Sequence, residues 1–76
     1  MSERLPRITA AELLRALQRD GWTIVRHKGG HAQLKHLTRP GRVTVPTHAR
    51  VTLNPKTLST ALEQAGLSID ELRHLL

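Results

Sequence analysis

The chain has 76 residues, no cysteine, and a net charge of +6 from twelve Lys and Arg against six Asp and Glu. A chain of this length hides only about 60% of its unfolded surface. It therefore has room for one thin, two-layered core and not for a wide enclosed cofactor cavity. The lack of cysteine excludes disulfide bonds and thiolate metal sites. We expect a single domain over residues 1–76 and no cofactor, with the core over about 8–66 and a short helix over 69–76.

The N-terminus has no apolar signal segment, and no apolar run approaches the roughly 18 residues that a membrane span needs. We therefore expect a cytoplasmic protein with no membrane partner. Positive charge concentrates between Arg26 and Lys56, and no acidic residue lies between Asp20 and Glu63. Such a field attracts a polyanion, with nucleic acid ahead of an acidic protein. Trp22 is the single aromatic residue besides the histidines, which excludes base stacking on several rings and leaves phosphates, 2′-hydroxyls and shape for recognition.

The first predicted element is a helix that starts after Thr9. Thr9 and Glu12 form a capping box, with Ile8 and Leu13 placed as a hydrophobic staple. Gly21 is expected to end the helix. Its apolar face repeats at helical spacing through Ala10, Leu13, Leu14 and Leu17.

Three strand-like runs follow, from Trp22 to His27, from His31 to His36 and from Arg42 to Pro46. Residues 38–41 are Thr, Arg, Pro and Gly, and the Pro-Gly pair is typical of a turn. Pro46 lacks a backbone donor and marks a strand end or an edge. The runs predict a three-stranded antiparallel sheet.

The register of the first hairpin can be argued from the apolar pattern. A two-residue turn at Gly29-Gly30 would place Ile24 on the face of Lys35. A three-residue loop over residues 28–30 avoids this, pairs His27 with His31, and uses Gly30 as the left-handed residue. We therefore predict that loop. The inner face then carries Trp22, Ile24, Ala32, Leu34, Val43 and Val45, and the outer face carries His27, His31, Gln33, Lys35 and Arg42.

Asn54 and Pro55 are the cap and first residue of a second predicted helix, which ends at Gly66. A capping box of Ser68 and Glu71 starts a short third helix. The expected fold is α+β, in the order α-β-β-β-α-α, with helices on one face of the sheet. The Asn54–Thr57 helix start could hold a phosphate, but an ordinary helix cap explains it better.

His31 is the candidate catalytic residue, because an imidazole can exchange a proton near neutral pH. In RNA it could take the 2′-hydroxyl proton, so that the oxygen attacks the adjacent phosphorus. Lys28, Lys35 and Arg42 would stabilise the added charge, and His48 is a possible phosphate contact. His27 could be a second proton carrier, although an exposed histidine without a role is the simpler reading. Four histidines lie between residues 27 and 48, but no carboxylate accompanies them, so we expect no metal site.

Several short segments form a recognisable pattern: Gly21-Trp22, Val25-Arg26, Lys28 to His31, Val43 to His48, Thr57-Leu58 and Gln64 to Leu67. Together they resemble the HicA toxins of bacterial type II toxin–antitoxin systems, over a match from about Ala10 to Leu72. The resemblance implies a fold like a double-stranded-RNA-binding domain and an mRNA interferase that acts without ribosomes. It also implies a HicB-type antitoxin that covers the active site in a hetero-oligomer. The family's catalytic histidine carries over to His31.

One position departs from the family pattern. The usual Gly-Ser-His reads Gly29-Gly30-His31 here, so a hydroxyl that could orient the imidazole or contact phosphate is absent, which predicts a slower enzyme. The leading hypothesis is a metal-independent endoribonuclease toxin, with His31 as general acid or base. RNA contacts are expected at Lys28, Gly29, Gly30, Lys35, Arg42 and His48. The alternatives are a non-catalytic RNA-binding module of the same fold and a domain whose basic face binds an acidic protein.

Overall fold

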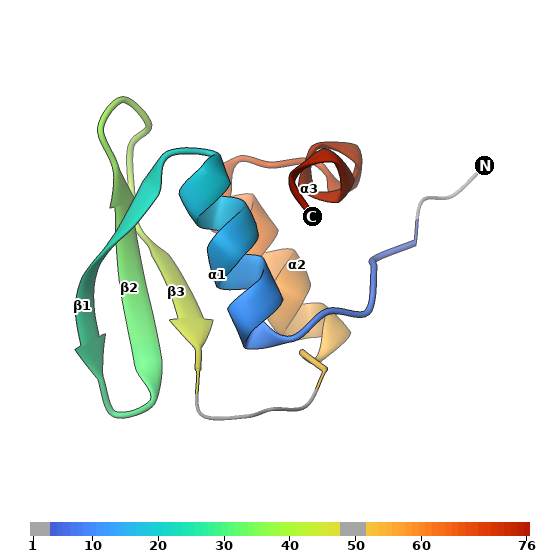
Figure 1. Cartoon of the computed structure of the whole chain (residues 1–76), viewed down its shortest axis with the longest axis horizontal. Coiled ribbons are helices and arrows are strands. Elements are labelled where there is room, and N and C mark those ends of the chain that lie inside the picture. The colour runs from blue at the N-terminus through green and yellow to red at the C-terminus, as the bar shows by residue number, and fades with distance from the viewer. Residues whose placement is uncertain (1–3, 48–51) are drawn as a thin grey trace.

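The structure, a computed structural model, describes residues 4–47 and 52–76 (Figure 1). Within these residues the order is α-β-β-β-α-α, which confirms the predicted α+β class. The elements are α1 (Ala10–Arg19), β1 (Trp22–Lys28), β2 (His31–His36), β3 (Val43–Pro46), α2 (Pro55–Ala65) and α3 (Ile69–Leu75). None of the helices in the described residues is long and apolar enough to cross a membrane.

Each helix begins at the cap that the sequence predicts. The Thr9 hydroxyl accepts from the backbone N–H of Glu12 and the Glu12 carboxylate accepts from that of Thr9, and Ser68 and Glu71 repeat this box before α3. Asn54 caps α2 through the N–H of Lys56. The backbone N–H of each N-cap residue, followed by its hydroxyl, lowers the pKa of Glu12 and Glu71 below the ordinary 4.5, because both groups stabilise the ionised carboxylate.

The sheet has the order β1-β2-β3, with both pairs antiparallel. The predicted three-residue loop is wrong: Lys28 pairs with His31 across a two-residue turn. A bulge at the register shift between Ile24 and Arg26 then takes up one residue, so the predicted pairs Ile24–Leu34 and Trp22–His36 are still formed. The turn and the bulge each shift the register by one residue, and the two shifts cancel.

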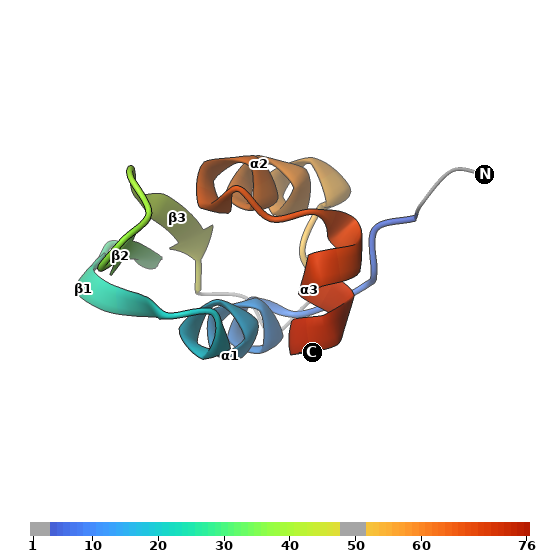
Figure 2. The same cartoon turned by 90° about the horizontal axis from the view of Figure 1, so that it is seen from above.

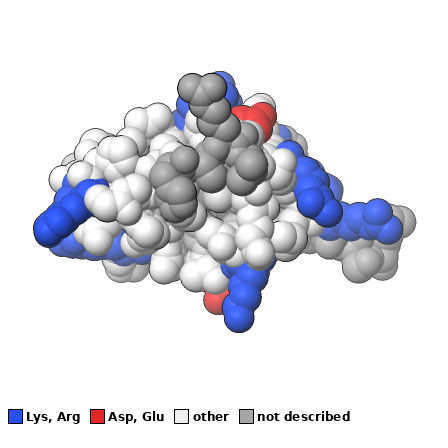
Figure 3. Space-filling view, turned by 90° about the horizontal axis from the view of Figure 1, so that it is seen from below, with Lys and Arg blue, Asp and Glu red and all other residues white. Residues whose placement is uncertain are grey.

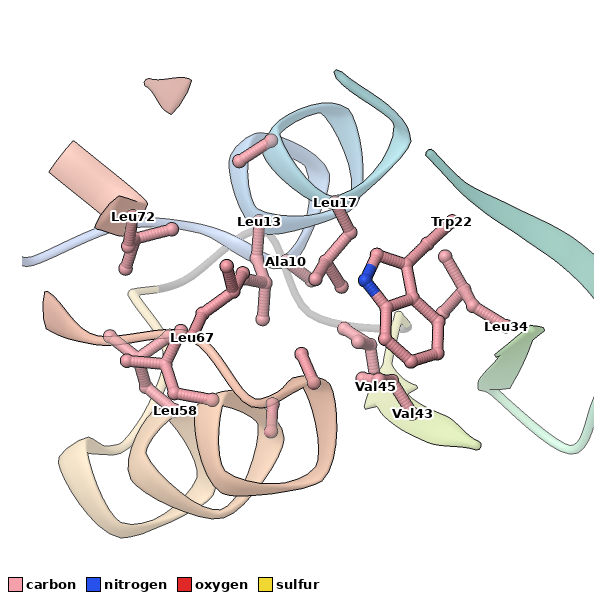
Figure 4. Packing of buried hydrophobic residues seen from close by; sticks show 14 of the residues in the cluster. Ala10, Leu13, Leu17, Trp22, Leu34, Val43, Val45, Leu58, Leu67 and Leu72 are labelled. Carbon is pink, nitrogen blue, oxygen red and sulfur yellow. The ribbon is translucent and has the colours of Figure 1, made fainter. Parts of the chain in front are cut away.

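The core lies among α1, α2 and the helix-facing side of the sheet. Figure 2 shows α1 and α2 on either side of β3, and Figure 4 shows the buried side chains of the two helices converging, with the sheet residues closing the third side. Leu13, Leu17, Trp22, Leu34 and Leu72 are all buried. Ile24, predicted to be in the core, is 37% exposed, because it borders the bulge.

The end of α1 is tied to the sheet by hydrogen bonds around Asp20. The Asp20 carboxylate accepts from the indole N–H of Trp22 at 3.2 Å and pairs with Arg39 at 3.2 Å. The Asp20 carbonyl accepts from Nε2 of His36 at 2.7 Å. Arg39 also donates to the carbonyl of Ala65 at the end of α2. These contacts fix the start of β1 and the loop between β2 and β3 relative to both helices.

The inner face of β2 makes a testable stability prediction. Leu34→Ala should lower the free energy of unfolding by about 2–5 kcal/mol, because the fully buried side chain leaves a cavity. Leu37→Ala, the same change at a fully exposed leucine just after the end of β2, should change it by less than about 0.5 kcal/mol. Urea denaturation measures both values, and equal effects would contradict this placement of the sheet.

Candidate functional site

His31 is the first residue of the central strand and its side chain is exposed on the outer face of the sheet, the face away from α1. It pairs with Lys28 on one side and with Pro46 on the other. The next residue, Ala32, is buried against the core. Because side chains alternate along a strand, the burial of Ala32 and Leu34 turns His31, Gln33 and Lys35 outward. The predicted outward position of His31 is therefore confirmed.

The turn before His31 is built from Gly29 and Gly30, with φ values of 60° and 78°. Positive φ at both central residues is the signature of a type I′ turn, which matches the twist of a hairpin. The carbonyl of Gly30 accepts from the backbone N–H of Thr47 at 2.6 Å. The turn is thus held by β1 through Lys28 and by Thr47, the residue after β3, and these contacts position the backbone that carries His31.

The imidazole of His31 contacts its own turn. Its Nδ1 lies 3.2 Å from the carbonyl oxygen of Gly29. A carbonyl oxygen only accepts hydrogen bonds, so Nδ1 carries the proton in this contact. In the neutral ring the lone pair is then on Nε2, which is the nitrogen able to accept a proton.

Two hollows meet at His31. The first, here called the β1 hollow, is about 300 Å³ in volume and is lined by Arg26, Lys28, His31 and Gln33. The second, the α2 groove, is about 500 Å³ and runs between the sheet and α2. Its lining residues are His31, Thr44, Pro46, Asn54, Lys56, Thr57, Thr60 and Gln64.

The charges are distributed unequally over this surface. Arg26 and Lys28 lie in the β1 hollow, whereas Lys56 is the Lys or Arg side chain that lines the α2 groove among residues 4–47 and 52–76. Figure 3 shows Lys and Arg side chains at several places on the molecule, and the group at the strand end has no Asp or Glu beside it in that view. The β1 hollow is therefore suited to anionic groups, and the described lining of the α2 groove offers mainly hydroxyls and amides, with Lys56 among them.

The other predicted cations extend the same face. Lys35 pairs with Thr23 and is exposed, one outward position beyond Gln33. The Arg42 guanidinium donates to Oε1 of Gln33 at 3.0 Å, which places it on the outer face as predicted. Neither Lys35 nor Arg42 lines a hollow with His31, so both lie further from the imidazole than Lys28 does.

His27 is not beside His31, and its predicted outer position is wrong. It pairs with the buried Ala32, and directly opposed residues of an antiparallel pair share a face. Its Nε2 shares a hydrogen bond of 2.7 Å with the hydroxyl of Thr47. The two-residue turn causes this, because it moves the partner of His31 from His27 to Lys28. His27 is therefore on the wrong face to act as a second proton carrier.

The remaining histidines are spread over the fold. In His36, Nε2 donates to the Asp20 carbonyl, and Nδ1 accepts from the backbone N–H groups of Thr38 and Arg39. This histidine is structural, and its ring also packs edge-on against Trp22. His48, the predicted phosphate contact, lies outside the described residues. Within residues 4–47 and 52–76, no three His, Cys, Asp or Glu side chains gather where a metal ion could bind.

The structure adds site residues that sequence reasoning missed. Arg26 continues the inward alternation of Trp22 and Ile24, yet the bulge turns it outward into the β1 hollow. The charged Arg26 at a position where alternation predicts a core residue is the sequence signal that could have indicated the bulge. Thr60 and Gln64 lie on the polar stripe of α2, and nothing local in the sequence distinguishes this stripe from an ordinary solvated helix face.

Comparison with known proteins identifies a family. The family model described as the HicA toxin of bacterial toxin–antitoxin systems matches residues 10–67 of the chain. That range includes the strands, both hollows and His31. No curated protein matches the chain significantly.

The two-residue turn can be tested at Gly29, whose surroundings are empty within 4 Å of an added Cβ. Any cost of substitution there comes from the positive φ alone. Asn tolerates the left-handed region and a β-branched residue does not. Gly29→Val should therefore be less stable than Gly29→Asn by about 1–2 kcal/mol in thermal or urea unfolding. Equal stability of the two variants would show that this backbone is not left-handed.

Proposed function

The chain belongs to the HicA toxin family of bacterial toxin–antitoxin systems, and from the geometry around His31 we propose that it is an mRNA-cleaving endoribonuclease. The observation that carries the proposal is the exposed imidazole at the junction of a cationic hollow and a polar groove. His31 acts as the general base. Its positive surroundings supply the attraction for the RNA backbone.

The contact between Nδ1 of His31 and the Gly29 carbonyl supports this role. It favours the tautomer in which Nε2 is unprotonated, and it aligns the ring along the turn. Nε2 removes the proton of a ribose 2′-hydroxyl, and the resulting oxyanion attacks the adjacent phosphorus. The bond from phosphorus to the 5′-oxygen breaks. The products are a 2′,3′-cyclic phosphate and a 5′-hydroxyl, whose proton comes from water in the open site.

The cations differ in how close they lie to the reacting phosphate in this mechanism. The additional negative charge of the phosphorane is stabilised by Lys28, which is paired directly with His31, and by Arg26. Lys35 and Arg42 bind phosphates further along the strand. Gly29 and Gly30 provide a turn without side chains, so the RNA backbone can come close to the imidazole.

The proposed antitoxin is a HicB-type protein that binds over the outer face and covers His31. The same Lys and Arg side chains that attract RNA would then pair with acidic groups of the antitoxin. Such a complex is a hetero-oligomer that blocks both hollows at once. Charge complementarity of this kind accelerates association, which suits a partner that must bind before RNA does.

A non-catalytic RNA-binding module is the second candidate, because the same cations would bind RNA without any proton transfer. It differs in one measurable respect, since its function would not depend on the His31 imidazole.

His31→Ala should reduce cleavage of a defined single-stranded RNA by at least about 100-fold, since a general base contributes about 10²–10⁴-fold. The assay is run in EDTA with the termini identified, and wild-type products should carry 5′-hydroxyl ends. His74→Ala is the matched control, because His74 is an exposed histidine on α3. Equal cleavage by the two variants would contradict the role of His31. Binding without cleavage by the wild type would favour the second candidate.

RNA affinity should depend on Lys28 through phosphate contact. The test uses a His31→Ala background, which prevents cleavage. There, Lys28→Ala should make the negative slope of log K against log salt shallower by about 0.7 for a single strand, the contribution of one phosphate contact. Arg15→Ala, an exposed cation on α1, removes the same charge from a different surface and should leave the slope unchanged. Fluorescence anisotropy over a salt series measures both slopes. Equal slopes for the two variants would contradict a phosphate contact by Lys28.

A further inference from the structure

Two glutamines near His31 have their amide oxygens already engaged. Oε1 of Gln64 accepts from the backbone N–H of Thr44 at 3.0 Å, and Oε1 of Gln33 accepts from the Arg42 guanidinium at 3.0 Å. A backbone N–H and a guanidinium can only donate, so chemistry requires the oxygen of each amide to face them. The NH₂ group of each glutamine is thereby oriented to present donors.

The surroundings of the two amides differ. Gln33 shares the β1 hollow with Arg26 and Lys28, where a phosphate is the natural ligand. Gln64 shares the α2 groove with the hydroxyl-bearing Thr57 and Thr60, and Lys56 lines the same groove from the first turn of α2, about two turns before Gln64. The part of the groove around Thr60 and Gln64 therefore offers a hydroxyl and an amide, which suit the edge of an uncharged base, whereas Lys56 suits an anion.

The groove is also placed and shaped for such a ligand. Thr57, Thr60 and Gln64 recur at i, i+3 and i+7, so they form one stripe along α2. The groove volume of about 500 Å³ falls in the range of small-molecule sites, about 300–1,000 Å³. His31 lines the same groove, so a nucleoside bound there carries its phosphate toward the imidazole.

Building on the endoribonuclease function proposed above, we propose that the α2 groove binds the nucleoside beside the cleaved phosphate and that Gln64 reads its base. An amide that presents only donors selects a keto group, such as O6 of guanine or O4 of uracil. It disfavours adenine and cytosine, which present amino groups at the equivalent positions. Gln64 is therefore the specificity-determining residue, and the β1 hollow binds the phosphate of any sequence.

Gln64→Glu tests this directly. The carboxylate still accepts from the N–H of Thr44, but it replaces the outward NH₂ donor by an acceptor. Gln33→Glu is the matched control, because it adds the same charge beside His31 and keeps an acceptor for Arg42. Initial cleavage rates are measured on single-stranded RNAs that differ only in the base on either side of the cleaved bond.

The wild type should cleave RNAs with guanine or uracil at one flanking position about tenfold faster than those with adenine or cytosine, the size of one base contact. Gln64→Glu should abolish or reverse that ratio, whereas Gln33→Glu should slow all four substrates alike. Gln64→Met, which removes the donor without adding charge, should also abolish the ratio. Circular dichroism establishes that each variant is folded.

Cleavage by Gln64→Glu and Gln64→Met with the wild-type ratio would overturn the reading of a base by Gln64 and leave the endoribonuclease function standing. A wild type that cleaves all four substrates at one rate would do the same. A wild type that cleaves no RNA would instead contradict the proposed function, and the specificity inference with it.

Discussion

The site depends on the alternation of side chains along β2, the central strand of the sheet. Ala32 and Leu34 are buried, and their burial is possible only if His31, Gln33 and Lys35 face the opposite way. A slip of one residue would bury a charged lysine and expose a leucine, so the hydrophobic effect strongly disfavours it. The position of the imidazole is thus secured by the same free energy that holds the core together.

In the proposed function, RNA recognition is divided between the two sides of the outer face. On the β1 side, Arg26 and Lys28 provide charge, which attracts any RNA and weakens as salt is added. On the α2 side, Thr60 and Gln64 provide directional hydrogen-bonding groups, which can distinguish one base from another. His31 lies where the two meet, so binding in both hollows would position a single phosphodiester for attack.

Contacts at the end of the sheet far from His31 hold α2 and the sheet in fixed relative positions. Asp20 joins α1 to Trp22 and His36, and Arg39 joins Asp20 to the end of α2. Gly21 is required there, since a Cβ at this residue would lie 2.6 Å from Nε2 of His36. Because α2 and the sheet form opposite walls of one groove, any loosening of this junction would change the groove's width.

Local sequence determined the helix starts and the outward position of His31, because capping boxes and strand alternation involve residues that are neighbours along the chain. The family followed from the order and spacing of several short motifs over most of the chain. Local sequence did not determine the face of His27 or Arg26, because a shorter turn and a bulge give the same distant pairs as a longer loop. It also could not reveal the α2 groove. That groove lies where α2 packs beside β3, and Gln64 there accepts from the N–H of Thr44, 20 residues away in sequence; such a juxtaposition forms only when the helix packs against the sheet.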